Sequence, residues 1–466
     1  MPYPVVYWLN DDILLGIFHC YRLDEENGWN DRLGWCKLSH VCQRWRHLVY
    51  ECSSYLGMHI QYTNSSPMAN TINHLPPLPL FVNYSWYYIG PKTPRPDELG
   101  IYHILRLHGR IYHIALDIAL PSLHEVLMLM NENFPRLEYL SLTGSVLSEH
   151  CLPPTLPKAF LAPNLQHLTL SGIGLPKRLR VLTSTVSLVT LTLRNIQTSI
   201  YFRPRLLVAR LRSLPLLEEL TIVFSIPIPR PSTERELLGE EGAPITLPSL
   251  KLLMFRGVGA YLESLVAQIR VPLLEKLYIR LFNQIAFVLP HLFYLINIIK
   301  VFQDSNAMVD FHGSEVSISR VHNHRLRTVL SFGVMCKSLD WQIDCAAQIC
   351  HALIPTLSGV EHLWLSYLHG YDQKIPTEMR NGGIDSATWH DLLRPFIGVK
   401  HLYISAGLLE ELSRALQEDE VGSDPGFLPN LQYILGENKR EDNLFNSFID
   451  TRQVVGRPVQ FQVVMY

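Results

Sequence analysis

A short apolar frame recurs along most of this chain of 466 residues. It first occurs as PRLEYLSL at 135–142 and returns as PNLQHLTL at 163–170, PLLEELTI at 215–222 and PLLEKLYI at 272–279. Each copy has one apolar residue, two mostly polar residues and then an apolar-x-apolar triplet. The first apolar residues of six successive copies are Leu137, Leu165, Leu188, Leu217, Leu250 and Leu274. Their separations are 28, 23, 29, 33 and 24 residues, which predicts one supersecondary unit per copy, stacked on its neighbours.

The triplet alternates as a half-buried strand does, so its leucines are expected to point into the core. Helices are expected between the strands, for example over 204–214, 260–269 and 389–396. The frame and its period resemble leucine-rich repeats. This resemblance implies an α/β fold, an irregular leucine-rich-repeat solenoid with parallel strands and with helices on the convex side. The coils are expected to be irregular because the usual Asn or Cys after the triplet is mostly absent.

Later copies of the frame lie at 359–366, 398–405 and 429–435, but the frame fades between 280 and 358. Within that gap, strands are expected at 308–319 and 326–333, and a helix at 339–355.

The region before residue 135 also lacks the frame. Its residues 59–62, 79–84 and 111–116 have strand-like patterns, and 96–107 has a helical one. The array is therefore extended over both regions.

Two amphipathic segments precede the repeats. In WLNDDILLGIFHCY, residues 8–21, Asn10 is a good N-cap and the acidic pair after it suits the positive first turn of a helix. KLSHVCQRWRHLVYE, residues 37–51, predicts a second helix with one apolar stripe. The stripe consists of Leu38, Val41, Cys42, Trp45, Leu48 and Val49. On spacing alone, the pair of helices is either a cap on the array or a surface for another protein.

These two segments resemble an F-box, whose pattern is Leu-Pro, an acidic pair, Ile-Leu, Ile-Phe and a second helix with Val, Cys, Arg and Trp. The matching residues are Leu9, Asp11, Asp12, Ile13, Leu14, Ile17, Phe18, Val41, Cys42, Arg44 and Trp45. Asn10 replaces the usual Pro and the gap between the helices is long, so the docking loop is expected to differ. The arrangement is similar to that of a large group of fungal F-box-like proteins. It implies a helical F-box over 1–56 and a repeat domain over 57–466.

The resemblance further implies a non-catalytic substrate receptor of a Skp–cullin–F-box ubiquitin ligase. In such a receptor the box docks on a Skp-type adaptor, and through it on a cullin, while the repeats hold a protein substrate. Adaptor contact is assigned to Leu9, Ile13, Leu14, Ile17, Phe18, Val41, Cys42, Trp45 and Leu48, some of which must form the core of the box itself. The alternative is a repeat scaffold that binds a protein without any link to ubiquitination.

Strand positions between the repeat leucines are candidates for substrate binding, because in a leucine-rich-repeat horseshoe they line the concave face. The candidates are Tyr139, His167, Glu219, Tyr278, Trp364 and Tyr403, with Thr190, Lys276, His362 and His401 at equivalent positions. Tyr and Trp there are plausible recognition anchors. The alternative is that the next coil or a loop covers these side chains, so that they bind nothing.

Neither enzymatic nor cofactor chemistry is indicated by the motifs. Phosphate-loop, dinucleotide, zinc-protease and serine-hydrolase motifs are lacking, so no catalytic residue, cofactor or metal is expected. The eight cysteines form no CxxC pair, which argues against a zinc or disulfide framework and favours reduced thiols in cytoplasm or nucleus. Cys345 and Cys350 are expected to be buried as small apolar residues.

Charge and hydropathy exclude two further classes of partner. Acids (42) and bases (40) nearly cancel, so no long-range attraction to nucleic acid or to an anionic membrane is expected. The most apolar run, 285–302, is interrupted by Pro290 and Lys300 and is short for a bilayer. It is therefore predicted to be a buried helix of the array.

Overall fold

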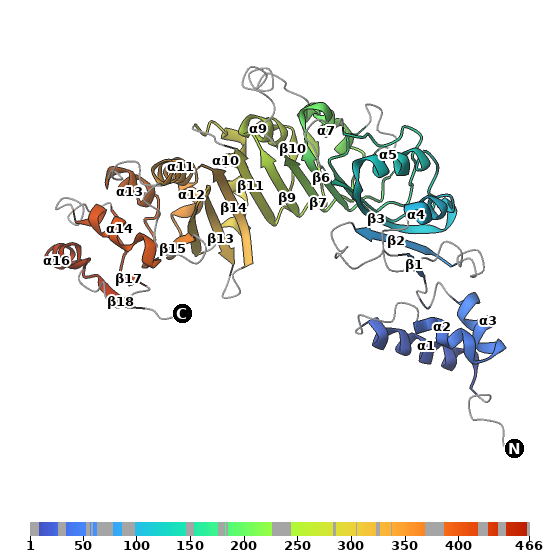
Figure 1. Cartoon of the computed structure of the whole chain (residues 1–466). Coiled ribbons are helices and arrows are strands. Elements are labelled where there is room, and N and C mark those ends of the chain that lie inside the picture. Colours follow the sequence, from blue (N-terminus) through green and yellow to red (C-terminus); the bar gives the residue numbers. More distant parts are fainter. Residues whose placement is uncertain are drawn as a thin grey trace. The chain divides into compact units, whose positions relative to one another are not determined.

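The contacts of the chain divide it into two units, Met1–Asn195 and Ile196–Tyr466, each described below by itself (Figure 1). This division does not coincide with the predicted domain boundary after residue 56. That residues 1–56 form a separate helical domain stays a prediction. The computed structural model describes residues 9–26, 34–52, 56, 59–62, 78–85, 98–145, 153–175, 182, 185–225, 244–282, 286–303, 305–322, 327–336, 338–368, 386–417, 427–436 and 444–463.

Three helices form the N-terminal segment: α1 (Asp11–Glu26), α2 (Gly34–Val41) and α3 (Gln43–Glu51). Asn10 caps α1 as predicted, because its Oδ1 accepts a hydrogen bond from the Ile13 N–H at 2.9 Å. The prediction of one continuous helix over 37–51 is wrong. Cys42 is extended (φ −158°, ψ 170°), and its Sγ accepts a bond from the Trp45 N–H, so one helix ends at Val41 and another begins at Gln43.

The first unit continues with a sheet of parallel strands. In spatial order these are β1 (Ile60–Tyr62), β2 (Leu80–Ser85), β3 (Ile111–Ala119), β4 (Tyr139–Ser145), β5 (His167–Ser171) and β6 (Thr190–Ile196). The strands predicted before residue 135 are thus confirmed. Helices α4 (Glu98–Leu105) and α5 (Leu120–Leu129) accompany them. The described stretch 153–166, which leads into β5, contains no helix, in keeping with irregular coils.

The sheet of the second unit follows a different order. Its strands lie in the sequence β7 (Glu219–Phe224), β9 (Leu252–Gly257), β11 (Lys276–Phe282), β14 (Arg327–Met335), β13 (Glu315–His322), β12 (Asn306–His312), β15 (His362–Leu368), β16 (His401–Ile404), β17 (Tyr433–Gly436) and β18 (Gln460–Val463). A separate parallel pair is formed by β8 (Ile245–Thr246) and β10 (Ile269–Arg270).

The expectation of parallel strands is wrong at β13, which runs antiparallel to both β12 and β14. The turn at Gly313 and Ser314 joins β12 to β13 directly, and so short a connection forces a hairpin. This is the region where the repeat frame fades in the sequence. The strands themselves were predicted there, but the frame carried no information about their direction.

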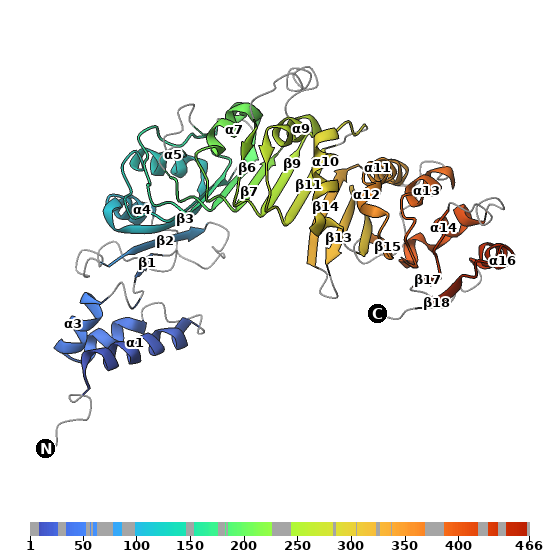
Figure 2. The ribbon, with the colours of Figure 1, turned by 180° about the vertical axis from the view of Figure 1, so that it is seen from behind.

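Helices of the second unit lie on one side of its strands in both views (Figures 1 and 2). They are α7 (Pro204–Leu211), α9 (Gly259–Ala267), α10 (Pro290–Ile298), α11 (Leu339–Ala352), α12 (Ile354–Leu357), α13 (Ser386–Leu393), α14 (Leu409–Leu416) and α16 (Asn446–Val454). Helix α9 packs on β9, and α11 packs on β13.

The repeat leucines form the cores of both sheets. Strand register aligns Leu140 with Leu168 in the first unit and Leu253 with Leu277 in the second, and all four are buried. Helices cover this side of the sheet, since an ideal Cβ on Gly144 of β4 would lie 3.0 Å from side chains of α5. The alternate residues of each strand point the other way, to what is called here the open face. The predicted inward stacking of the leucines is confirmed.

Candidate binding surfaces

The N-terminal helices have a small core of their own. Leu14, Phe18 and Leu48 are buried, and the rings of Phe18 and Trp45 meet edge to face with centroids 4.8 Å apart. Three of the residues assigned to adaptor contact therefore hold the helices together and do not reach solvent. Adaptor binding itself stays a prediction, now restricted to the remaining residues.

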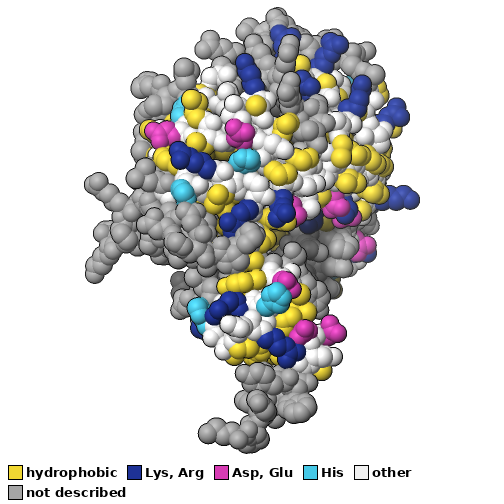
Figure 3. Space-filling model, turned by 90° about the vertical axis from the view of Figure 1, so that its right-hand side faces the viewer, with side chains coloured by type: hydrophobic (Ala, Val, Ile, Leu, Met, Phe, Trp, Pro, Cys, Tyr) yellow, Lys and Arg dark blue, Asp and Glu magenta, His cyan; other side chains and the backbone are white. Residues whose placement is uncertain are grey.

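Three apolar residues of the same set face solvent. Ile13, Ile17 and Val41 are 50%, 45% and 58% exposed. Ile13 and Ile17 lie one turn apart on one side of α1. Hydrophobic side chains are visible on this segment in Figure 3 among charged ones. Leu9, Cys42 and Trp45 are half-buried, so the exposed apolar side chains of the predicted set on α1 are the two isoleucines.

Arg44 ties the start of α1 to α3. Both Nε and Nη2 of Arg44 donate to Asp11 Oδ1, at 3.0 and 2.6 Å, and Nη2 also donates to the Leu9 carbonyl at 2.6 Å. Both side chains are partly exposed, so the pair contributes only about 0.2–1 kcal/mol to stability. Its effect is to fix the start of α1, including Leu9, against α3. Asp11 was predicted to suit the first turn of a helix, but no sequence pattern indicated its pairing with Arg44.

A row of neighbouring rings crosses the open face of the first unit. Successive ring centroids of His59, Phe81, His113, Tyr139 and His167 lie 4.1, 5.5, 4.2 and 5.9 Å apart. Register aligns the last four across β2 to β5. Tyr139 and His167 were predicted to share this face. The other three were missed because their strands lack the leucine frame, although the alternation in 111–116 could have indicated His113.

His113, at the centre of this row, is uncharged at neutral pH. Burial, with a smaller contribution from the nearby His59 ring, lowers the pKa of His113 to about 4. His113 is therefore an uncharged ring at neutral pH, and it stacks on Phe81 and Tyr139 as an aromatic group.

A second ring cluster lies on the open face of the second unit. Trp364 and Tyr403 stack with centroids 4.5 Å apart and planes 8° apart. Beside them His362 stacks on His401 at 4.5 Å, and His401 on Tyr433 at 5.1 Å. The register of β15 to β17 brings these residues together. The first four are predicted positions, whereas Tyr433 was missed.

An ion pair borders this cluster. The Lys400 ammonium donates to Glu361 Oε1 at 2.8 Å. This bond holds the pKa of the Glu361 carboxyl below its usual value. The cluster is thus aromatic at its centre and has balanced charges at its edge.

The remaining predicted positions contribute no ring to either cluster. The Tyr278 hydroxyl donates to the Thr328 carbonyl at 2.9 Å, so it is occupied by its own sheet. Glu219 is exposed at the start of β7 and is aligned across Leu252 with Lys276. Thr190 is aligned with His167 at the end of the row in the first unit.

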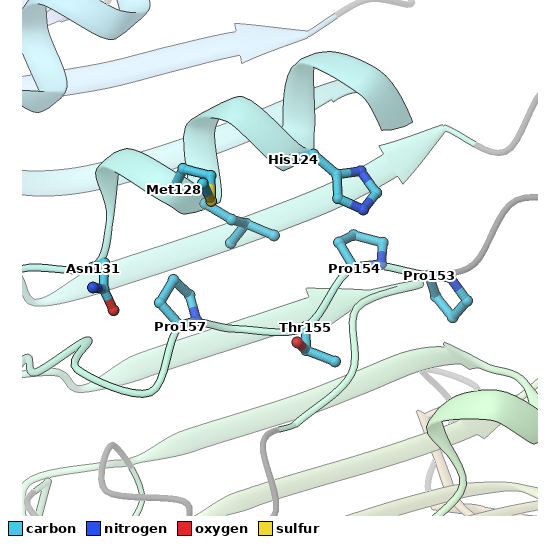
Figure 4. A pocket seen from close by; sticks show the side chains of 8 residues that line it. His124, Met128, Asn131, Pro153, Pro154, Thr155 and Pro157 are labelled. Carbon is cyan, nitrogen blue, oxygen red and sulfur yellow. The ribbon is translucent and has the colours of Figure 1, made fainter.

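Two hollows lie outside the open faces. One, of about 500 Å³, lies between α5 and residues 153–157 of the first unit and is lined by His124, Met128 and three prolines (Figure 4). His124 Nδ1 is bonded to the Leu120 carbonyl of its own helix at 3.0 Å. The lining is mostly apolar, with no set of charged groups converging on it.

The other hollow, of about 1060 Å³, lies between α10 and β10 of the second unit. Its walls include Tyr294 and Ile298, which are exposed, whereas Leu292 and Ile296 are buried. The prediction of a buried helix in 285–302 therefore holds for one face of α10 only.

Among the residues that the structure describes, no group of three or more His, Cys, Asp or Glu side chains is placed to hold a metal ion. Cys345 and Cys350 are buried, as predicted. Within the same described ranges, none of the helices has both the length and the apolar character that crossing a membrane requires.

No protein-family model and no curated protein matches the chain. Among solved structures, a chain of the TLR13–ssRNA13 complex aligns at 14% identity with a TM-score of 0.34, covering 88% of this chain and 49% of that one. This chain thus spans about half the length of the TLR13 chain. The leucine-rich repeat-containing protein LegL7 from Legionella pneumophila aligns at 12% identity with a TM-score of 0.27, covering 86% and 99% of the two chains. At these scores, the leucine-rich-repeat-like fold of the present chain rests on its own strand register and buried leucines.

Proposed function

We propose that this chain is a non-catalytic substrate receptor of a Skp–cullin–F-box ubiquitin ligase. Its N-terminal helices dock on the Skp-type adaptor, which reaches the cullin, and the open faces of its sheets hold a protein substrate. The observation that supports docking best is the exposure of Ile13 and Ile17 on one side of the capped helix α1.

The physical argument rests on how the apolar residues of these helices are divided. Leu14 and Phe18 already fill the small core, so Ile13 and Ile17 are not needed for it. Burying the exposed half of each isoleucine against a partner contributes on the order of 1 kcal/mol. Arg44 holds the start of α1 in place, so that surface is ordered before a partner arrives.

The test is binding of a purified Skp-type adaptor to the full-length chain, measured by calorimetry. Ile17→Asp is expected to weaken binding at least about tenfold, because it places a charge in an apolar contact. The melting temperature should not change, since the side chain is exposed. Val454→Asp, at an 88% exposed position of α16, is the matched control and should bind as the wild type does.

A scaffold that is not coupled to ubiquitination is the second candidate, and the replacement of the usual Pro by Asn10 favours it. It predicts that the wild-type chain does not bind the adaptor at all. Adaptor binding that Ile17→Asp leaves at wild-type strength would also contradict docking through α1. In both cases the open faces would still serve as protein-binding surfaces.

A further inference from the structure

Two arginines lie side by side on the open face of the second unit. Arg256 on β9 and Arg280 on β11 are direct cross-strand partners in the parallel ladder. Their side chains follow the same alternation as Met254 and Tyr278, opposite to the buried Phe255 and Ile279. Like charges in this arrangement repel each other, so the pair favours an anion between or above them.

A carboxylate beside the pair contacts only one of the two guanidinium groups. Glu315 on β13 forms an ion pair with Arg280. Its side chain lies over Gly333 of the intervening strand, where an ideal Cβ would be 2.5 Å from Glu315 Oε1. The glycine therefore leaves the space through which the carboxylate reaches Arg280.

Arg256 has no carboxylate partner among the described residues. Its guanidinium lies over the Phe282 ring, 5.3 Å from the centroid, and its Nη2 is 3.8 Å from the Met335 sulfur. Its Nε is buried without a hydrogen-bond partner. A ring and a thioether neutralise no charge, so the planar donor fork of Arg256 is positioned without its preferred acceptor.

The next acid along the same register row is too far away to serve. Asp310 on β12 lies three strands from Arg280, which is about 14 Å at the usual strand spacing. Burial raises the pKa of Asp310, which a side-chain hydrogen bond with Ser366 partly offsets. The arginine pair with Glu315 therefore leaves one positive charge uncompensated on this part of the face.

We infer that Arg256 and Arg280 form a site for an acidic linear protein segment, with an Asp or Glu side chain of that segment bound by the donor fork of Arg256. Calling this segment part of a substrate rests on the proposed function, but the site itself does not depend on adaptor docking. Trp364 lies four strands from β11 on the same face, about 19 Å away. An extended segment spans that distance in about six residues.

Glu315 competes for this site in the free protein. Glu315 occupies one side of Arg280. An incoming carboxylate either shares Arg280 with Glu315 or displaces Glu315 from it. Glu315→Gln keeps the shape of the side chain but removes its charge, so it should strengthen binding of an acidic segment. A purely structural role of the two arginines would not produce a gain of this kind.

The test uses the full-length chain and a display library of random linear peptides, with no adaptor present. Enriched peptides are expected to carry Asp or Glu, and the most enriched one, fluorescently labelled, serves as the probe for affinity. Arg256→Gln should weaken binding of this probe about tenfold, as should replacing its acids by Asn and Gln. Glu315→Gln should tighten it severalfold, and added salt should weaken it. Arg194→Gln, an exposed arginine on the strand β6 of the first unit, is the matched control and should have no effect.

Three results would overturn the inference: no enriched peptide, enriched peptides without acids, or unchanged affinity in Arg256→Gln. If Arg256→Gln does not fold, Glu315→Gln decides alone, and wild-type or weaker binding by it contradicts the site. Each of these results leaves adaptor binding to the N-terminal helices unaffected, so failure here is distinguishable from failure of the proposed function.

Discussion

The open faces of the two units differ, although the strands beneath them are built in the same way. Both sheets align buried leucines such as Leu140 and Leu253 on the helix-covered side. The open face of the first unit carries a row of rings centred on the neutral His113, whereas that of the second carries an arginine pair and the stack of Trp364 on Tyr403. The leucine frame therefore determines the fold, and the residues between the leucines determine what each face can bind.

The largest effects are expected where the two units are alike. Leu140→Ala in the first unit and Leu253→Ala in the second each remove a fully buried side chain, so each should cost about 2–5 kcal/mol of stability. Hydrogen exchange resolved along the chain measures the loss in each unit separately. A loss in only one unit would show that the shared frame does not stabilise both.

Smaller effects are expected from the ring pairs. Double-mutant cycles on Trp364 with Tyr403, and on His113 with Tyr139, should each give coupling energies of about 0.5–1.5 kcal/mol in denaturant unfolding. The variants are Ala at each position, alone and together. Coupling near zero in the pair of the second unit would mean that Trp364 and Tyr403 do not support each other as one binding surface.

A pH-dependent effect is expected from His113 in the first unit. In the unfolded chain His113 takes up a proton below about pH 6.5, whereas in the folded chain it does so only near pH 4. The unfolded state therefore binds more protons between these values, and the contribution of His113 to stability falls as pH drops from about 6.5 to about 4. Above about pH 6.5 the contribution of His113 to stability does not change with pH.

Comparison with His113→Gln isolates this contribution, because the other titrating groups are common to both proteins. The stability difference between wild type and variant should be constant from pH 7 to 8 and should shift against the wild type on acidification. A difference that stays constant down to pH 4 would contradict the half-buried, neutral state of this ring.

The sequence predicted the features that depend on local patterns. The leucine frame located β4 to β7, β9, β11 and β15 to β17. Asn10 was recognised as a cap, and the alternate positions Trp364 and Tyr403 were placed on one face. These predictions were correct because strand alternation and helix capping depend on only a few adjacent residues.

What could not be predicted depends on contacts between distant residues. Cys42 lies in an apolar stripe that reads as one helix, yet its sulfur caps a new one. The direction of β13 and the pairing of Arg256 with Arg280 are set by strand register, which spacing within one strand does not reveal. The neutral state of His113 likewise follows from burial by neighbouring strands.

We propose that one chain carries two independent binding surfaces, one for an adaptor and one for an acidic segment. Binding of both ligands to Ile17→Asp and Arg256→Gln of the full-length chain tests this independence. Ile17→Asp should lose the adaptor and keep the acidic peptide, and Arg256→Gln should do the reverse. Loss of both ligands in either folded variant, or retention of both in both variants, would contradict it.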